Sequence, residues 1–167
     1  MYGLVPYNVS EIQKGIQFGH AVVRFGRDLT KERSRLLKVY NHWADHNETF
    51  IILNGGTTNT NLDRLGTLNQ HCRELNSNGV RNGTFYEPDL GDQLTAVVFL
   101  VDDRVWDRES WPDYVVPGHK ERGGVPVEEW LATDPAYAKW KRKFSRKPAE
   151  ADQIVWLRQY LRPLKLA

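Results

Sequence analysis

The segment "LTAVVFLVDD" at residues 94–103 is the clearest β-strand in the sequence, because it is apolar, rich in β-branched residues and closed by two acids. The same signals predict strands at 2–7, 48–53 and 80–88. Apolar residues at helical spacing predict helices at 10–25, 29–46 and 62–75. Strands mixed with helices in this order predict an α/β domain, in which a sheet carries packed helices.

The character of the sequence changes after Asp103. Residues 104–126 are rich in Pro, Gly and aromatic residues, which predicts a wrapping loop, and two helices are expected at about 127–145 and 149–161. We therefore expect a domain at 1–103 and a C-terminal extension at 104–167 that packs on it.

Composition favours a soluble intracellular protein. The chain has 167 residues, of which 40% are hydrophobic and 26% charged, with a net charge of +2. This charge gives only weak attraction to nucleic acid. The single cysteine, Cys72, excludes an internal disulfide and fits a reducing compartment. We see no secretory signal and no membrane-spanning run, so we expect no membrane association and a cytoplasmic location.

The helix expected at 10–25 carries a stripe of polar residues. Gln13, Gln17 and His20 are spaced i, i+4, i+7 and share one face, and Lys14 lies beside them. Such a stripe could line a site. Alternatively, Gln17 and His20 are satisfied polar groups near the rim of the core. Ser10 and Gln13 also form a capping-box pattern at the helix start.

The same helix carries Gly15 and Gly19, four residues apart. Each glycine costs about 0.5–1 kcal/mol relative to alanine in a helix, so a stripe of them needs a reason. We expect a close approach by another backbone, a helix or a ligand, and tight helix packing is the simplest version.

The connection "FYEPDLGDQLTA" at 85–96 gathers Glu87, Asp89 and Asp92 between two strands. Carboxylates at a sheet edge could act as bases or orient a histidine, and the Thr95 hydroxyl could face the same edge. A solvated acidic turn, shaped by Pro88 and Gly91, is the alternative.

Two further segments are candidate binding elements. "NGGTTNTN" at 54–61 could cradle an anion with the backbone amides around Asn54, Gly55 and Gly56, although a simple strand-to-helix loop explains it too. "KWKRKFSRK" at 139–147, which contains Lys141 and Arg142, suits a nucleic-acid backbone or a solvated helix face. His42 and His46 lack a clear third ligand, so we expect no metal, and nothing in the sequence indicates a cofactor.

Together, "IQKGIQFGHAVV" and the later acidic loop resemble the type II peptidyl-tRNA hydrolases. The first-helix signature matches at Gln17 and His20-Ala21. The family's aspartate, short loop and strand-opening threonine are matched by Asp89, "LGDQL" and Thr95. The chain looks similar to compact phage-encoded members, and the resemblance covers about residues 1–103.

The resemblance implies a mixed four-stranded sheet with helices on both faces, and hydrolysis of the ester that joins a peptide to the 3′ ribose of tRNA. His20 and Asp89 would position or deprotonate water, a lysine such as Lys14 would stabilise the oxyanion or bind phosphate, and Thr95 would hold substrate or water. Gln13, Gln17, the 54–56 loop, Lys141 and Arg142 are candidate substrate-binding residues. Family members often pair as homodimers.

The sequence also departs from the family. With Gln17 and His20 aligned, the family lysine falls on Gln13, and Lys14 is one residue, or about 100°, out of step. The arginine-threonine pair expected after the aspartate is missing. Two alternatives therefore stand beside an ester hydrolase: an inactive binding module for RNA or a nucleotide-like molecule, and a protein-interaction factor that works through 104–167.

Overall fold

The computed structural model describes residues 1–59, 64–114, 133–144, 146 and 148–167. It divides into two units. The first joins Met1–Val101 to Pro163–Ala167, and the second is Asp102–Arg162. The predicted extension at 104–167 differs from the second unit at its C-terminal end, because the last five residues belong with the first unit.

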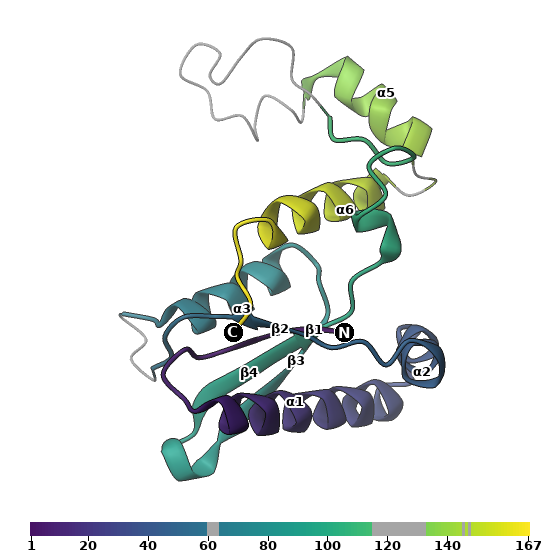
Figure 1. Cartoon of the computed structure of the whole chain (residues 1–167). Helices are drawn as coiled ribbons and strands as arrows, with labels where there is room; N and C mark the ends of the chain where they lie inside the picture. Colours follow the sequence, from purple (N-terminus) through teal and green to yellow (C-terminus); the bar gives the residue numbers. More distant parts are fainter. Residues whose placement is uncertain (60–63, 115–132, 145, 147) are drawn as a thin grey trace. The chain divides into compact units, whose positions relative to one another are not determined.

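The first unit is built on a four-stranded mixed sheet, drawn in Figure 1. The strands run in the order β2-β1-β4-β3; β1 and β2 are parallel, and the other pairs are antiparallel. Their bounds are β1 Tyr2–Val5, β2 Ile51–Asn54, β3 Asn82–Glu87 and β4 Gln93–Phe99. The last two strands along the chain, β3 and β4, are neighbours in the sheet.

Three helices accompany this sheet: α1 Glu11–Lys31, α2 Leu37–His46 and α3 Thr67–Ser77. Figure 1 shows α1 on one face of the sheet and α3 on the other, with α2 beside the end of α1. The buried face of α1 contributes Phe18, Ala21, Phe25 and Leu29 to the core. The predicted α/β class is therefore confirmed, and α1 is held firmly enough to position side chains on its flanks.

The second helix, predicted at 29–46, ends as predicted at His46 but begins only at Leu37, because the chain breaks between α1 and α2. Arg33 adopts a left-handed φ of 49°, and the Ser34 amide donates to the Leu29 carbonyl at 3.0 Å. This bond satisfies a carbonyl at the end of α1 and stops the helix. The break contains neither glycine nor proline. The helical spacing of apolar residues therefore predicted one continuous helix across it.

The helix predicted at 62–75 begins later, at Thr67, with Gly66 as its N-cap residue. Gly66 fits there because a side chain would meet the backbone of Thr57 at 2.5 Å. Residues 62 and 63 of the predicted helix lie outside the described residues.

The C-terminal segment of the chain extends the sheet at its β2 edge. The Asn54 amide donates to the Lys165 carbonyl at 2.9 Å, and the Ala167 amide donates to the Ile52 carbonyl at 3.0 Å. Leu53 and Leu166 form an antiparallel bridge between these bonds. An edge strand that would otherwise be open is thus covered by the chain's own tail.

The second unit contains α5 Pro135–Phe144 and α6 Pro148–Leu161. The helix expected at 149–161 is therefore confirmed to within one residue at its start. Within the helix expected at 127–145, the structure has α5 at Pro135–Phe144. Residues 127–132 and 145 lie outside the described residues, as do residues 115–126 of the expected loop.

Arg158 of α6 is buried within the second unit. Its guanidinium donates to the carbonyl of Val105 at 2.6 Å and to that of Arg104 at 3.2 Å, and it pairs with Asp113 at 2.6 Å. A buried guanidinium needs such partners, so Arg158 fixes the segment after β4 against α6.

Candidate functional site

The polar stripe of α1 meets the sheet through Gln17, which is 6% exposed. Gln17 Nε2 donates to Glu87 Oε2 at 2.6 Å, and the Thr95 hydroxyl donates to Gln17 Oε1 at 2.7 Å. The amide therefore bridges the end of β3 and the start of β4. The structure thus brings together two of the predicted residues, Gln17 and Thr95, with Glu87 as the third member.

A β-bulge in β4 gives Thr95 its neighbours. Phe85 pairs with Ala96 and Tyr86 pairs with Leu94, so Thr95 is the extra residue of β4 at the bulge. The Thr95 hydroxyl also lies 3.4 Å from the Phe85 carbonyl. Thr95 is fully buried, so its hydroxyl serves this network and does not face solvent.

His20 lies one turn beyond Gln17, on the exposed side of α1. Its imidazole stacks on the Phe85 ring, with the ring centroids 4.7 Å apart and the planes at 18°. The Arg24 guanidinium lies over the same aromatic ring, 4.8 Å from its centroid. The Phe85 ring therefore contacts the His20 imidazole and the Arg24 guanidinium, which come from successive turns of α1.

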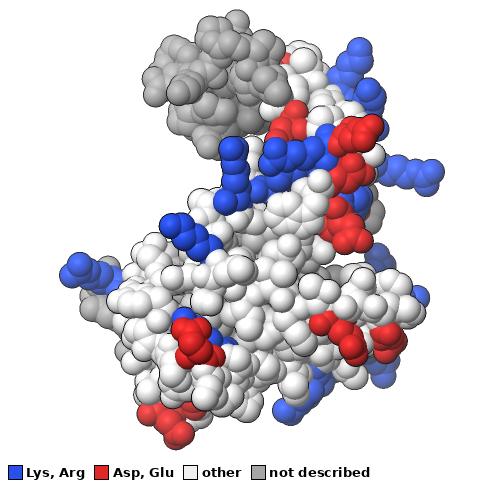
Figure 2. Space-filling view, in the orientation of Figure 1, with Lys and Arg blue, Asp and Glu red and all other residues white. Residues whose placement is uncertain are grey.

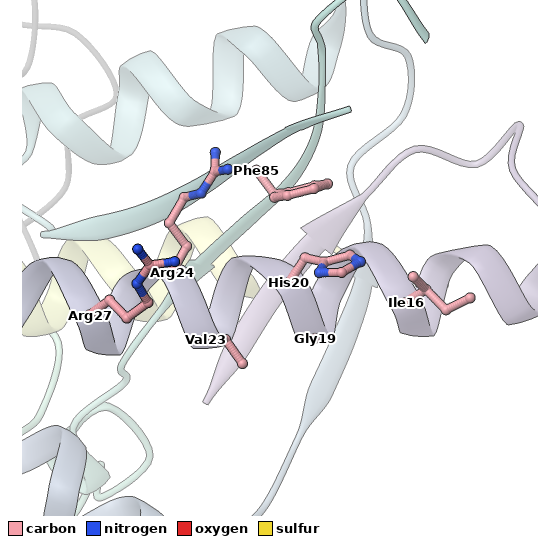
Figure 3. A pocket seen from close by; sticks show the side chains of 7 residues that line it. All are labelled: Ile16, Gly19, His20, Val23, Arg24, Arg27 and Phe85. Carbon is pink, nitrogen blue, oxygen red and sulfur yellow. The ribbon is translucent and has the colours of Figure 1, made fainter. Parts of the chain in front are cut away.

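These side chains border a shallow pocket of about 360 Å³, shown in Figure 3. We call it the α1 pocket. In Figure 3 the Arg24 side chain rises from α1 toward the strand that carries Phe85, and Gly19 leaves the helix surface bare between its neighbours. Its lining residues are Ile16, Gly19, His20, Val23, Arg24, Arg27 and Phe85.

Lys14 is turned away from the α1 pocket. It is 8% exposed, and its ammonium group pairs with Glu11 Oε1 at 2.9 Å. Lys14 and His20 are six positions apart, or about 120° around the helix, with Gln17 between them. The proposed role of Lys14 as an oxyanion ligand stays a prediction.

Asp89 lies in a short 3-10 helix, Pro88–Leu90, and is exposed. Its amide donates to Glu87 Oε1 at 3.5 Å, and Glu87 acts as the cap of this turn. The carboxylate that contacts the polar stripe is therefore Glu87, and it contacts Gln17 and not His20. Asp89 does not line the α1 pocket.

Gln13 and the 54–56 loop have structural partners. The Gln13 side chain accepts from the Ser10 amide at 3.2 Å and completes the predicted capping box, which is confirmed. In the loop, the Gly55 amide donates to the Val5 carbonyl, the Gly56 amide to Asn54 Oδ1 and the Thr57 amide to Thr67 Oγ1. With these bonds in place, the three amides are not available to an anion.

The glycine stripe is more open than expected. A Cβ added to Gly15 or Gly19 would meet nothing within 4 Å among the described residues, so tight helix packing does not explain either of them. The close approach occurs instead at Gly26, where a Cβ would lie 2.6 Å from the Tyr40 ring. Gly19 leaves room in the α1 pocket, whereas Gly26 lets α2 pack on α1.

Lys141 and Arg142 belong to α5 in the second unit. Lys141 pairs with Asp152 and lies 4.8 Å from the Tyr137 ring centroid, and Arg142 is exposed. Burial raises the pKa of Tyr137, and its hydrogen bond to Asp152 adds to the rise. Figure 2 shows positive and negative side chains close together on the visible face of this unit, a mixed surface unlike the uniformly positive one that nucleic acid favours.

Five residues of the α1 pocket were not predicted from the sequence: Ile16, Val23, Arg24, Arg27 and Phe85. The i, i+4, i+7 spacing of His20, Arg24 and Arg27 was available as a signal. Phe85 was not, because its contacts with His20 and Arg24 join residues that are far apart in the sequence. His42 and His46 stack with centroids 4.5 Å apart, and no group of three metal-binding side chains comes together in the described part of the chain.

No protein-family model, no curated protein and no solved structure matches this chain. Within the described ranges, no helix is both long enough and apolar enough to cross a bilayer. The geometry of the α1 pocket and of the Gln17 network is therefore the main guide to function.

Proposed function

We propose that this protein hydrolyses the ester bond of peptidyl-tRNA or a related aminoacyl ester at the α1 pocket. The observation that carries the proposal is the hydrogen bond between Gln17 and Thr95, at 2.7 Å across 78 positions of sequence. The family resemblance assigns these two residues to one site. His20, the third residue of that signature, lies on the next turn of α1 at the pocket.

In this mechanism His20 acts as the general base. Its exposed imidazole accepts a proton from a water molecule, and the resulting hydroxide attacks the ester carbonyl to form a tetrahedral oxyanion. The oxyanion then collapses, the bond to the ribose 3′ oxygen breaks, and His20 returns the proton to that leaving oxygen. Gln17, Thr95 and Glu87 hold the turn of α1 in place and so position His20.

The test is release of peptide from peptidyl-tRNA by the purified protein. Wild type should release peptide, and His20→Ala should lower the rate by about 10²–10⁴-fold, the usual contribution of a general base. His46→Ala, an exposed histidine on α2, is the matched control and should leave the rate unchanged. A wild type that releases nothing, or that equals His20→Ala, contradicts the proposal.

The second candidate is a binding module that holds RNA or a nucleotide-like molecule without cleaving it. It is favoured by the sealed hydroxyl of Thr95 and by the position of Asp89 outside the pocket, because neither can then act on a water beside His20. Thermal-shift measurements with tRNA and nucleotides test it. Ligand at 100 times its dissociation constant should stabilise the fold by about 2.7 kcal/mol, with no peptide released.

The homodimer and the phage-encoded origin that the resemblance suggests stay predictions, as does the cytoplasmic location expected from the sequence. Sedimentation of the full chain tests the first of these. Removal of residues 104–162 with retention of partner binding would contradict the third alternative, a protein-interaction factor that works through the extension at 104–167.

A further inference from the structure

Two arginines in the α1 pocket have no acidic partner among the described residues. Arg24 and Arg27 are exposed, and neither forms an ion pair with any residue in the part of the chain that the structure describes. They stand three positions apart on one side of α1, where like charges repel each other. An anion bound between them would remove that repulsion.

Phe85 holds one of these arginines in place before any ligand binds. The Arg24 guanidinium lies 4.8 Å from the ring centroid of Phe85, and the His20 imidazole stacks on the same ring. A guanidinium fixed on an aromatic ring loses less conformational freedom when it binds a ligand. Its planar set of donors also matches a phosphate, which it can bind through two parallel hydrogen bonds.

The remaining walls of the α1 pocket are apolar. Ile16 is 49% exposed and Val23 is 62% exposed, and Gly19 between them leaves open space. A pocket of about 360 Å³ is at the small end of ligand sites. Charge at one side and apolar surface at the other fit a compact molecule that has a phosphate and a ring system.

We propose that the α1 pocket is a phosphate-ester site, in which Arg24 and Arg27 bind the phosphate of a nucleotide while Ile16 and Val23 face its sugar or base. This inference rests on the proposed function, because it assigns the part of the tRNA substrate that the pocket holds. It uses residues that the family resemblance does not supply.

The experiment is a binding titration of the full chain, followed by the amide NMR signals of α1, with AMP, adenosine and inorganic phosphate as separate probes. AMP should bind at least about tenfold more tightly than adenosine, since only AMP engages the arginines. Inorganic phosphate should shift the same signals more weakly. Arg24→Gln should weaken AMP about tenfold or more, as expected for losing hydrogen bonds to a charged group.

Two further variants sharpen the result. Arg24→Lys keeps the charge but loses the planar donor set, so it should also weaken AMP. Arg73→Gln on α3 removes an exposed arginine away from the pocket and should leave AMP binding unchanged. Equal affinity for AMP and adenosine, or an Arg24→Gln variant that binds AMP like wild type, overturns the inference.

Vesicles of phosphatidylglycerol form a separate arm of the experiment, because exposed aliphatic residues beside arginines could also meet an anionic lipid surface. Vesicle binding without AMP binding overturns the inference. The outcomes distinguish this inference from the proposed function. Peptide release without AMP binding contradicts only the phosphate site. AMP binding that depends on Arg24, without peptide release, contradicts only the hydrolase.

Discussion

The hydroxyl of Thr95 donates a 2.7 Å hydrogen bond to the side-chain oxygen of Gln17, and both residues are buried. This bond also decides the orientation of the amide, because the other end of Gln17 then donates to Glu87. The start of β4, the end of β3 and the first helix are thereby joined by one side chain.

Thr95→Val should therefore destabilise the protein. The substitution keeps the shape of the side chain but leaves a buried amide oxygen without its donor, which costs about 1–3 kcal/mol. Urea unfolding measures the loss. In the double variant Thr95→Val with Gln17→Leu, the free-energy changes should not add, because the two residues are in contact. Additive changes would show that the bond does not form.

The glycines of α1 should respond to alanine in opposite ways. Gly19→Ala fills open space and adds helix propensity, so it should stabilise the fold by about 0.5–1 kcal/mol. Gly26→Ala forces a methyl group against the Tyr40 ring and should destabilise by about 1–3 kcal/mol. Thermal unfolding of the two variants checks this. A destabilising Gly19→Ala would point to packing that the structure does not contain.

Stability should fall in mild acid because of His71 on α3. Burial lowers the pKa of His71 below its usual 6.5, although Glu74 opposes the shift. The unfolded chain therefore takes up this proton first as pH falls, and unfolding is favoured from about pH 6.5 downward through the folded pKa. Urea midpoints between pH 7.5 and pH 5 should decline less for His71→Gln than for wild type. His42→Gln, at an exposed position, should follow the wild-type curve.

Removal of the C-terminal pairing should expose the β2 edge to solvent exchange. A chain that ends at Leu164 loses the carbonyl of Lys165, which accepts from the Asn54 amide. Hydrogen exchange at Asn54 should accelerate in this variant. The neighbouring Gly55 amide, which donates to Val5, is the internal control and should keep its rate. Unchanged exchange at Asn54 would mean that the tail does not pair with β2.

The sequence was most informative where a signal is local. β-Branched apolar runs located the strands, and the Ser10–Gln13 pattern marked the start of α1 because capping depends on residues three positions apart. Contacts between distant residues could not be found in this way. Glu87 and Asp89 are equally acidic in the sequence, but β3 ends at Glu87 and Asp89 lies in the turn that follows, so Glu87 is the one that meets Gln17.

The break in the helix after Lys31 could not be predicted from the sequence either. The left-handed residue there is Arg33, a type that seldom adopts this conformation, so no local signal announces it. Likewise, the sequence alone does not distinguish the surroundings of Gly19 from those of Gly26. Their different surroundings arise from the approach of Tyr40 on α2, which depends on where the break lies.

The pairing of the C-terminal segment with β2 can form only after the last residues of the chain have been synthesised. A ribosome delivers Ile51–Asn54 more than a hundred residues before Lys165–Ala167, so the outer edge of this strand emerges without its partner. During that interval the nascent chain presents unsatisfied amides and carbonyls to its surroundings. Slow translation of the intervening segment would lengthen this vulnerable period, and chaperone protection should matter most then.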